Sequence, residues 1–385
     1  MKRLTSLGVG IAAVAMLAAC GGGSGSSDSG GSSSTGAGQS ASSGANSQCV
    51  TDAKAKVDAA RAVVDLKAPP RPLALDKLSG KKVWVINAVD TPLLLEIVDG
   101  FKAGAKAAGM EVQVVSAKGS ASRMVQGTAE AVAQKAAGIM LLATDPRLVS
   151  GPLQKAKAAG IPVVDSLVGG PDAPNDEGQF AHVEADMKSS GGVVGDWILA
   201  DSNCNAHVAV MASTVLSVHR LLTAGSTGEI KRLCPSCTAE EVPFDSTKMA
   251  TDLGSNSLNV LRRNPKINYL FPVLDAGVQF VVPAVQQAGK ADSVKVVSHD
   301  GVNTNIENMR KGVGQVADVA FPPAKWIGWA EFDQTARGIL KEEPVDWTIP
   351  TRLIDKTNVG TDDAQLFPAY QGFEEKFTAA WKGAS

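Results

Sequence analysis

The chain has 385 residues, of which 37 are Lys or Arg and 39 are Asp or Glu, so its formal net charge at pH 7 is −2. This near balance provides no basic field for nucleic acid, and beyond residue 20 no apolar run is long enough to span a bilayer. The remaining length is sufficient for two domains of ordinary size.

The first residues have the layout of an export signal. Lys2 and Arg3 precede an apolar run over 7–19, and Leu17-Ala18-Ala19-Cys20 places small residues before a cysteine. This pattern predicts cleavage before Cys20 and acylation of its thiol; the alternative is a buried free cysteine after an N-terminal helix. Several acyl chains anchor firmly, because each buried methylene contributes roughly 0.8 kcal/mol. We therefore expect an extracytoplasmic lipoprotein, anchored to the cell membrane in the periplasm or at the cell surface.

Two segments precede the first predicted strand. Residues 21–48 are almost entirely Gly, Ser, Ala, Thr, Asn and Gln, which predicts a disordered tether because so little apolar surface cannot offset the entropy of ordering. Residues 49–80 form the predicted N-terminal extension, with an Ala-rich helix over 50–66 and an extended Pro-rich connector over 68–72.

From residue 81 onward, β-rich runs alternate with segments of helical period. The first predicted series has strands over 82–86, 112–115, 139–142 and 161–164, with helices over 92–108, 122–136 and 146–159. The second has strands over 208–211, 239–243, 269–271, 294–297 and 315–319, with helices over 187–200, 219–232, 247–263, 276–288 and 304–311. Such alternation is typical of parallel sheets covered by helices, and two series predict two lobes with a cleft between them.

In open parallel sheets, ligands bind beyond the carboxyl ends of the strands. The loops at those ends carry Asp90, Thr91, Asp145, Arg147, Asp165, His219, Arg220, Phe244, Asp245, Asp275, His299, Asp300 and Phe321. A single Asp in such a loop is more often a helix cap than a ligand contact, and Asp145 and Asp275 suit that reading. Arg220 and Asp300 offer a donor fork and an acceptor pair for hydroxyl groups, so we expect ligand contact there.

Several local patterns carry a family resemblance over residues 81–358. They are Thr91-Pro92-Leu93-Leu94, the run 182–186 followed by Gly191-Gly192, Val242-Pro243-Phe244-Asp245, the loop 271–275, and Ser298-His299-Asp300-Gly301. In this order and spacing they resemble the ribose-binding protein group, the type I periplasmic sugar-binding proteins of ABC importers.

The resemblance implies an α/β fold of two lobes, each a parallel sheet flanked by helices, with three inter-lobe crossings. These fall near Glu184, near 320–322 and near 347–350. The first lobe would comprise 81–185 and 322–346. The second would comprise 186–321 and 347–385, including a C-terminal helix.

The resemblance also implies roles for individual residues. Arg220 and Asp300 fall at hydroxyl-binding positions and Phe244 at an aromatic that packs on the bound ring. The expected ligand-binding set is Thr91, Leu93, Leu94, Asp145, Arg220, Phe244, Asp275, Asp300 and Phe321. Leu93, Leu94, Leu274 and Phe321 replace more polar or aromatic residues of the family pattern, and 165–168 lacks its Asp-Arg pair. We therefore expect a small hydroxylated ligand with an apolar face, delivered to an ABC permease by a monomeric protein; a sensory module for a membrane receptor is the alternative.

Besides Cys20, the chain has Cys49, Cys204, Cys234 and Cys237, an even number in an oxidising compartment. Structural disulfides are the preferred reading, with a redox pair at 234–237 and a zinc site as alternatives. If Cys204 pairs with Cys234 or Cys237, the remaining one needs Cys49, and the N-terminal extension is then fastened to the second lobe. The motifs of nucleophile elbows, zinc proteases and phosphate-binding loops are absent from the sequence, so we predict no enzyme, cofactor or metal.

Overall fold

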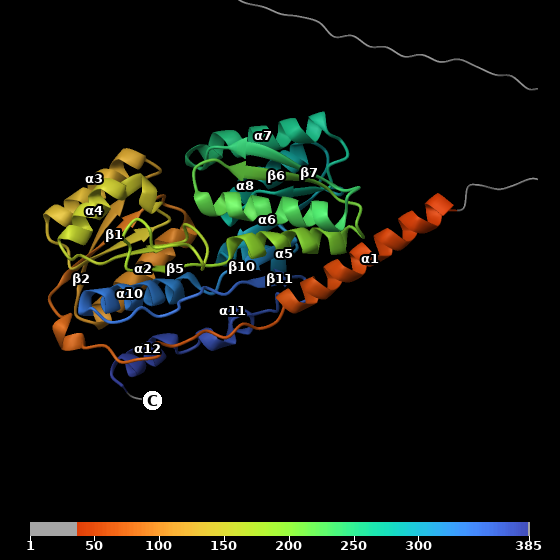
Figure 1. Cartoon of the computed structure of the whole chain (residues 1–385). Coiled ribbons are helices and arrows are strands. Elements are labelled where there is room, and N and C mark those ends of the chain that lie inside the picture. Colours follow the sequence, from red (N-terminus) through yellow and green to blue (C-terminus); the bar gives the residue numbers. More distant parts are fainter. Residues whose placement is uncertain (1–36, 384–385) are drawn as a thin grey trace, which may run out of the picture. The chain divides into compact units, whose positions relative to one another are not determined.

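The computed structural model describes the backbone of residues 37–383 and the side chains of 46–383 (Figure 1). The residues from Gly44 onward form one compact unit, which contains both lobes. Cys20 and the predicted export signal lie outside the described residues. Among the helices that are described, none is both long and apolar enough to cross a membrane.

The first lobe is built on an all-parallel sheet of strand order β2-β1-β3-β4-β5. Its strands are β1 (Lys82–Asn87), β2 (Glu111–Ser116), β3 (Gly138–Leu142), β4 (Val163–Ser166) and β5 (Ala181–Val183). Its helices are α2 (Pro92–Ala107), α3 (Ala121–Ala133), η2 (Pro146–Val149), α4 (Ser150–Ala158) and α10 (Ala324–Leu340). The central strand β3 is buried along its whole length, which explains its continuous apolar run.

The second lobe has a sheet of order β11-β10-β9-β8-β6-β7. Its strands are β6 (His207–Ser213), β7 (Thr238–Phe244), β8 (Tyr269–Phe271), β9 (Lys295–Asp300), β10 (Ala317–Ala320) and β11 (Arg352–Asp355). All pairings are parallel except that of β11 with β10. Its helices are α5 (Met187–Asp201), α6 (Ser217–Leu233), η3 (Ser246–Lys248), α7 (Met249–Arg263), α8 (Asp275–Gln287), α9 (Asn303–Arg310) and α11 (Asp363–Leu366).

The predicted two-lobe α/β fold is therefore confirmed, with an antiparallel edge strand in the second sheet that the sequence pattern did not indicate. Two crossings of the chain lie side by side, because Glu184 and Thr348 form a parallel bridge. The backbone N–H of Ile349 donates to the carbonyl of Glu184 at 2.8 Å. The third passes from β10 to α10 through Phe321.

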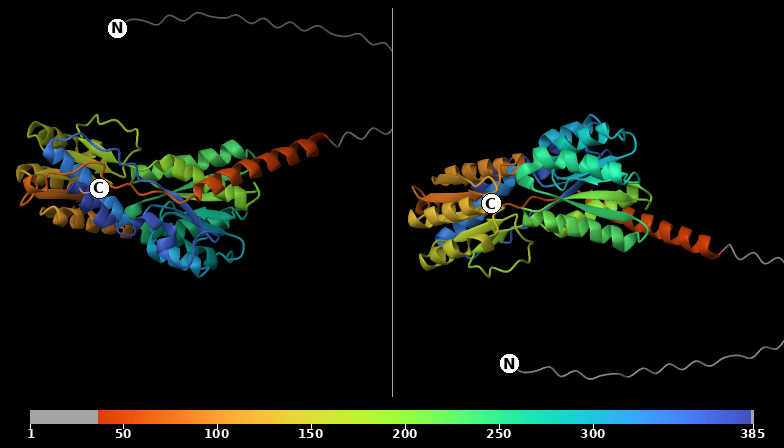
Figure 2. Two further views of the ribbon diagram at one scale, coloured as in Figure 1. Left: turned by 90° about the horizontal axis from the view of Figure 1, so that it is seen from below. Right: turned by 90° about the horizontal axis from the view of Figure 1, so that it is seen from above.

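Both ends of the described chain differ from expectation. Helix α1 (Ala37–Ala60) begins inside the segment 21–48, which was expected to be a disordered tether. Its residues Cys49, Ala53 and Val57 are buried, so this part of the helix packs against the rest of the protein, and the helix continues from there toward its N-terminus. The C-terminal helix α12 (Phe373–Trp381), after η4 (Pro368–Tyr370), packs on the first lobe rather than the second (Figure 2). Trp381 stacks on Trp329 of α10 with ring centroids 5.2 Å apart, which explains this placement.

The disulfides are Cys49–Cys204 and Cys234–Cys237. Cys49 is thus joined to the second lobe as expected, but directly to Cys204. The conditional pairing of Cys204 with Cys234 or Cys237 is wrong. Those two cysteines lie only three positions apart and bridge each other across the turn before β7.

The N-terminal extension contacts both lobes. At the second lobe, the guanidinium of Arg61 donates to Asp355 at 2.6 Å, and Lys56 pairs with Glu229. The extension then runs through η1 (Leu75–Lys77) to β1, and on the first lobe Leu73 N–H donates to the carbonyl of Trp381 at 2.9 Å. It is therefore a further connection between the lobes, in addition to the crossings that the resemblance implies.

Candidate functional site

A small cavity of about 30 Å³ lies between the lobes, at the carboxyl ends of strands from both sheets. The first lobe contributes residues that follow β1, β3 and β4, and the second contributes residues that follow β6, β8 and β9. The lining consists of Thr91, Leu93, Leu94, Ala143, Leu167, Met187, Leu216, Val218, His219, Leu274, Asp300 and Phe321. This is the position at which open parallel sheets bind ligands.

Backbone strain is concentrated around this inter-lobe cavity. Ala143, Leu167 and Asp300 line it with φ angles of 50°, 54° and 132°, and Val273, beside the lining residue Leu274, has φ of 58°. Each lies at the end of a parallel strand, and for a non-glycine residue such a conformation costs of order 1–3 kcal/mol. Strain of this kind persists where the surrounding structure holds it and is frequent at ligand sites.

The lobes touch each other at the rim of the cavity. Ser217 Oγ of α6 donates to the carbonyl of Val168 in the first lobe at 2.6 Å. The loop that carries Leu167 and Val168 is held by Glu184, whose carboxylate accepts the N–H groups of Val168 at 2.9 Å and Gly169 at 3.2 Å. Burial, together with the charge of Asp165, raises the pKa of Glu184 to about 8. In this arrangement the cavity is well below the roughly 300 Å³ of an ordinary ligand pocket, so ligand entry requires the lobes to separate.

Asp300 and His219 are the buried ionisable groups that line the cavity. Burial raises the pKa of Asp300 to about 8, and its Oδ2 accepts the N–H of Asp275 at 3.3 Å. Burial lowers the pKa of His219 to about 3, and its Nδ1 has no hydrogen-bond partner among the described residues. Near pH 7 the site therefore presents a mostly protonated carboxyl and a neutral imidazole, both of which can hydrogen-bond to hydroxyl groups.

Asp275 does not line the cavity but supports Asp300 from behind. Its carboxylate accepts Val302 N–H at 2.7 Å and Gln315 Nε2–H at 3.0 Å, and Gln315 also donates to Asp318 at 2.6 Å. Burial raises the pKa of Asp275 to about 6. Asp275 is the first residue of α8 and its carboxylate accepts none of that helix's N–H groups, so it neither caps α8 nor lines the cavity; it joins the start of α8 to the loop after β9.

Asp145 and Arg220 also lie outside the lining. Asp145 caps η2, and its carboxylate accepts two hydrogen bonds from the Arg147 guanidinium, at 3.0 and 2.7 Å. Burial acts to raise the pKa of Asp145, but Arg147 and the charge of Arg220 outweigh it, so that the pKa lies below its ordinary value. Arg220 is exposed on α6 of the second lobe, whereas Asp145 belongs to the first lobe. The attraction between their charges therefore acts between the lobes.

Phe244, the last residue of β7, is 3% exposed and belongs to the hydrophobic core; it does not line the cavity. Phe321 does line it and packs edge-on against His299 with ring centroids 4.7 Å apart. Leu93 and Leu94 lie in the first turn of α2, which Thr91 caps by accepting the N–H of Leu94 at 3.4 Å. The apolar walls expected from the sequence are thus present.

His219 lines the cavity, although it was not selected as a ligand contact from the sequence. The buried positions of α6 include His219, Leu222, Ser226 and Ile230, which are spaced at helical period. This stripe indicates that His219 faces inward and Arg220 outward, and it could have been recognised in the sequence. Ala143, Leu167, Met187, Leu216 and Val218 were also not selected, because single apolar residues in loops carry no distinctive signal.

Comparisons with known proteins agree with this architecture. The ribose import binding protein RbsB of Bacillus subtilis is 23% identical over 218 residues, which cover 56% of this chain and 68% of the relative. A 5-methylthioribose transporter solute-binding protein from Thermotoga lettingae superposes with a TM-score of 0.68 at 18% identity, covering 79% of this chain and 98% of the other. An ABC transporter solute-binding protein from Agrobacterium vitis with bound allitol has a TM-score of 0.66 at 20% identity, covering 73% and 97%.

The fold and the position of the inter-lobe cavity define a two-lobed binding protein of the extracytoplasmic type. Residues 83–336 match the periplasmic binding protein domain, and the chain belongs to that family. The family is one of binding proteins, so the chain is a non-catalytic component rather than an enzyme.

Proposed function

We propose that this chain is the substrate-binding lipoprotein of an ABC importer and that it captures a small hydroxylated ligand with an apolar face. The observation that carries the proposal is the inter-lobe cavity. Strand ends with strained backbone from both lobes line it, and the buried polar side chains of His219 and Asp300 lie there among several leucines. Relatives of the same fold are described as binding allitol or 5-methylthioribose, or as importing ribose. The name 5-methylthioribose itself describes a sugar that carries an apolar substituent.

The proposed mechanism is hinge closure. A ligand shifts the equilibrium toward the closed state only if it binds that state more tightly than the open one. Thr91, Leu93 and Leu94 of the first lobe, with His219 and Asp300 of the second, would contact one ligand from both sides. Phe321, at a crossing, would close the pocket on the hinge side.

The proposal is tested by identifying the ligand. Small molecules retained by natively purified protein are analysed by mass spectrometry, and candidates are then titrated by calorimetry. The panel contains ribose, glucose, allitol, myo-inositol and 5-methylthioribose. We expect the apolar-substituted sugar to bind more tightly than ribose. Tight binding of ribose or glucose, without binding of less polar compounds, would contradict the proposed ligand chemistry.

Membrane anchoring through Cys20 is tested separately. In the producing cell, Cys20→Ser is expected to release the protein from the membrane fraction, because acylation requires the thiol. A Cys20→Ser protein that remains in the membrane fraction after cleavage of the signal would refute the anchor.

A further inference from the structure

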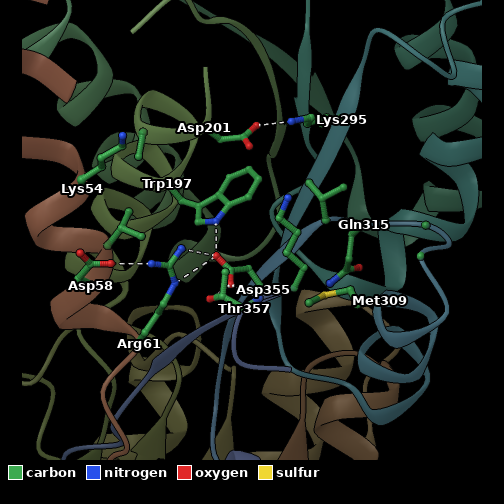
Figure 3. A pocket seen from close by; sticks show the side chains of 16 residues that line it. Lys54, Asp58, Arg61, Trp197, Asp201, Lys295, Met309, Gln315, Asp355 and Thr357 are labelled. Atoms are coloured by element: carbon green, nitrogen blue, oxygen red, sulfur yellow. Dashed lines mark hydrogen bonds and ion pairs between the residues drawn. The ribbon is translucent and has the colours of Figure 1, made fainter. Parts of the chain in front are cut away.

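A second, larger cavity of about 510 Å³ lies at the pole of the second lobe opposite to the inter-lobe cavity, and Figure 3 shows it from close by. The two cavities lie at opposite ends of strand β9: Lys295 at its start lines the larger cavity, and Asp300 at its end lines the inter-lobe cavity. One wall is helix α1, through Lys54, Val57 and Asp58, together with Arg61 directly after the helix. The volume falls within the range of small-molecule pockets. We call it the extension cavity.

The interior of the extension cavity is partly apolar and is fixed in position. Val57, Trp197, Met309 and Val316 contribute to its lining. The indole Nε1–H of Trp197 donates to Oδ2 of Asp355 at 2.9 Å. Figure 3 shows Trp197 and Arg61 converging on Asp355. An aromatic surface held in place in this way suits a flat apolar group.

The acidic groups of the cavity are already engaged. Asp355 accepts from Arg61 at 2.6 Å, from Trp197, and from Thr357 Oγ1 at 2.6 Å. Burial acts to raise the pKa of Asp355, but these donors outweigh it and hold the pKa below its ordinary value. Asp201 pairs with Lys295 at 2.6 Å, and Asp58 pairs with Arg61 at 2.6 Å. Little capacity is left for a cationic ligand.

The basic groups are in excess. The lining contains Lys54, Arg61, Lys295 and Lys356 against Asp58, Asp201 and Asp355. Lys54 and Lys356 have no ion-pair partner among the residues whose side chains are described. Their ammonium groups are free to attract an anion, and the low polarity of the adjoining wall favours a ligand that also has an apolar part.

We propose that the extension cavity is a second ligand site, which binds a small amphipathic anion, namely a carboxylate on an aromatic body. The aromatic body would lie against Trp197 and Met309, and the carboxylate would face Lys54 and Lys356. The site is independent of the inter-lobe ligand and of its transport. Because α1 forms one wall and Cys49–Cys204 holds α1 against the second lobe, the site depends on that disulfide.

The proposal is tested with 1-naphthoate as the probe and the neutral 1-naphthamide as its comparator, titrated by calorimetry into the full-length protein. We expect naphthoate to bind at least tenfold more tightly than the amide. The double substitution Lys54→Gln/Lys356→Gln is expected to weaken naphthoate binding at least tenfold. Lys102→Gln/Lys106→Gln on α2 of the first lobe is the matched control and is expected to leave it unchanged.

A variant of the disulfide gives a second readout. Cys49→Ser/Cys204→Ser is expected to weaken naphthoate binding, with a circular dichroism spectrum that shows both lobes still folded. His219→Ala in the inter-lobe cavity should have no effect on the probe. Absence of naphthoate binding at millimolar concentration, or binding that the lysine substitutions leave unchanged, would overturn the proposal. Binding lost in His219→Ala would place the probe in the inter-lobe cavity and overturn it as well.

Discussion

His219 and Arg220 are neighbours in the first turn of α6, yet they have different environments. His219 is 6% exposed and lines the inter-lobe cavity, whereas Arg220 is exposed and lies near Asp145 of the other lobe. Among the described residues the buried imidazole of His219 has no partner for Nδ1, which is costly unless something pairs with it, and a ligand hydroxyl meets that requirement. We therefore infer that His219 is the stronger candidate for direct contact.

His219→Ala is expected to weaken ligand binding by about tenfold, because a net hydrogen bond contributes roughly 0.5–1.5 kcal/mol and tenfold in affinity corresponds to about 1.4 kcal/mol. The Kd is measured by calorimetry with the ligand identified as above. Arg220→Ala is the matched comparison and is expected to have the smaller effect, with an unchanged melting temperature. If Arg220→Ala abolishes binding and His219→Ala does not, the arginine contacts the ligand after the lobes rearrange, and our assignment of His219 fails.

Helices α5 and α6 pack so closely that glycines are required at their contact. A Cβ atom added at Gly225 would overlap the backbone carbonyl oxygen of Lys188, and one added at Gly191 would overlap the carbonyl oxygen of Leu222. Each of these helices contributes a residue to the lining of the inter-lobe cavity: Met187 comes from α5 and His219 from α6. Close helix packing in the second lobe therefore also determines the shape of the site.

Gly225→Ala is expected to destabilise the protein by several kcal/mol, because the clash is with backbone and cannot be relieved by a side-chain rotation. Gly228→Ala, one turn further along α6, meets nothing within 4 Å and serves as the control. There the loss of a mid-helix glycine should be stabilising by up to about 1 kcal/mol. Urea unfolding measures both free energies, and equal effects of the two substitutions would contradict the close contact.

The two disulfides restrict the unfolded chain to very different extents. Cys49–Cys204 joins residues 155 positions apart, whereas Cys234–Cys237 spans three. The chain-entropy relation gives about 5 kcal/mol for the long loop and about 2 kcal/mol for the short one. Cys49→Ser/Cys204→Ser should therefore lower the free energy of unfolding more than Cys234→Ser/Cys237→Ser, as measured in urea without reductant. The reverse order would show that the N-terminal extension separates from the lobe before global unfolding.

For the molecule as a whole, buried carboxyl groups make stability depend on pH. Burial raises the pKa of Glu184, Asp300 and Glu331 to about 8 each. Between the ordinary pKa near 4 and the raised value near 8, the folded protein retains protons that the unfolded chain releases. These groups therefore lower the free energy of unfolding as the pH rises toward 8. Burial lowers the pKa of His219 to about 3 and of His299 to about 4, which acts in the opposite direction, but only below about pH 6.5.

The free energy of unfolding is therefore expected to fall between pH 6.5 and 8.5, where the carboxyl groups act without opposition from the histidines. Urea unfolding at half-unit steps of pH measures the slope. Glu331→Gln removes one contributing group from α10, away from the inter-lobe cavity, and is expected to flatten the slope. A stability that rises over this range would be incompatible with neutral buried carboxyl groups.

Much of the architecture was predictable because its determinants are local. The buried runs at 82–86 and 139–142 became β1 and β3, and the periodic segment after Thr91 became α2. The edge strands β5 and β11 were missed because each has only two adjacent or alternating apolar positions next to polar residues, whereas the equally short β8 is a continuous apolar run. The predicted cleft loops, except the one after β7, contribute to the lining of the inter-lobe cavity, since the direction of a parallel strand places its end at a known edge of the sheet.

The remaining features depend on residues that are distant in the sequence. Helical period and strand patterning are properties of a short segment, so the order of strands and helices and the presence of bridging cysteines could be read directly. Partner choice is different: Cys49 pairs with Cys204, and Trp381 stacks on Trp329, because packing brings those residues together. The same holds for Asp145, Arg220, Phe244 and Asp275, which lie in the predicted loops but outside the inter-lobe cavity. The extension cavity, formed by helices and strands from across the chain, has no local pattern and exists only because those elements assemble around it.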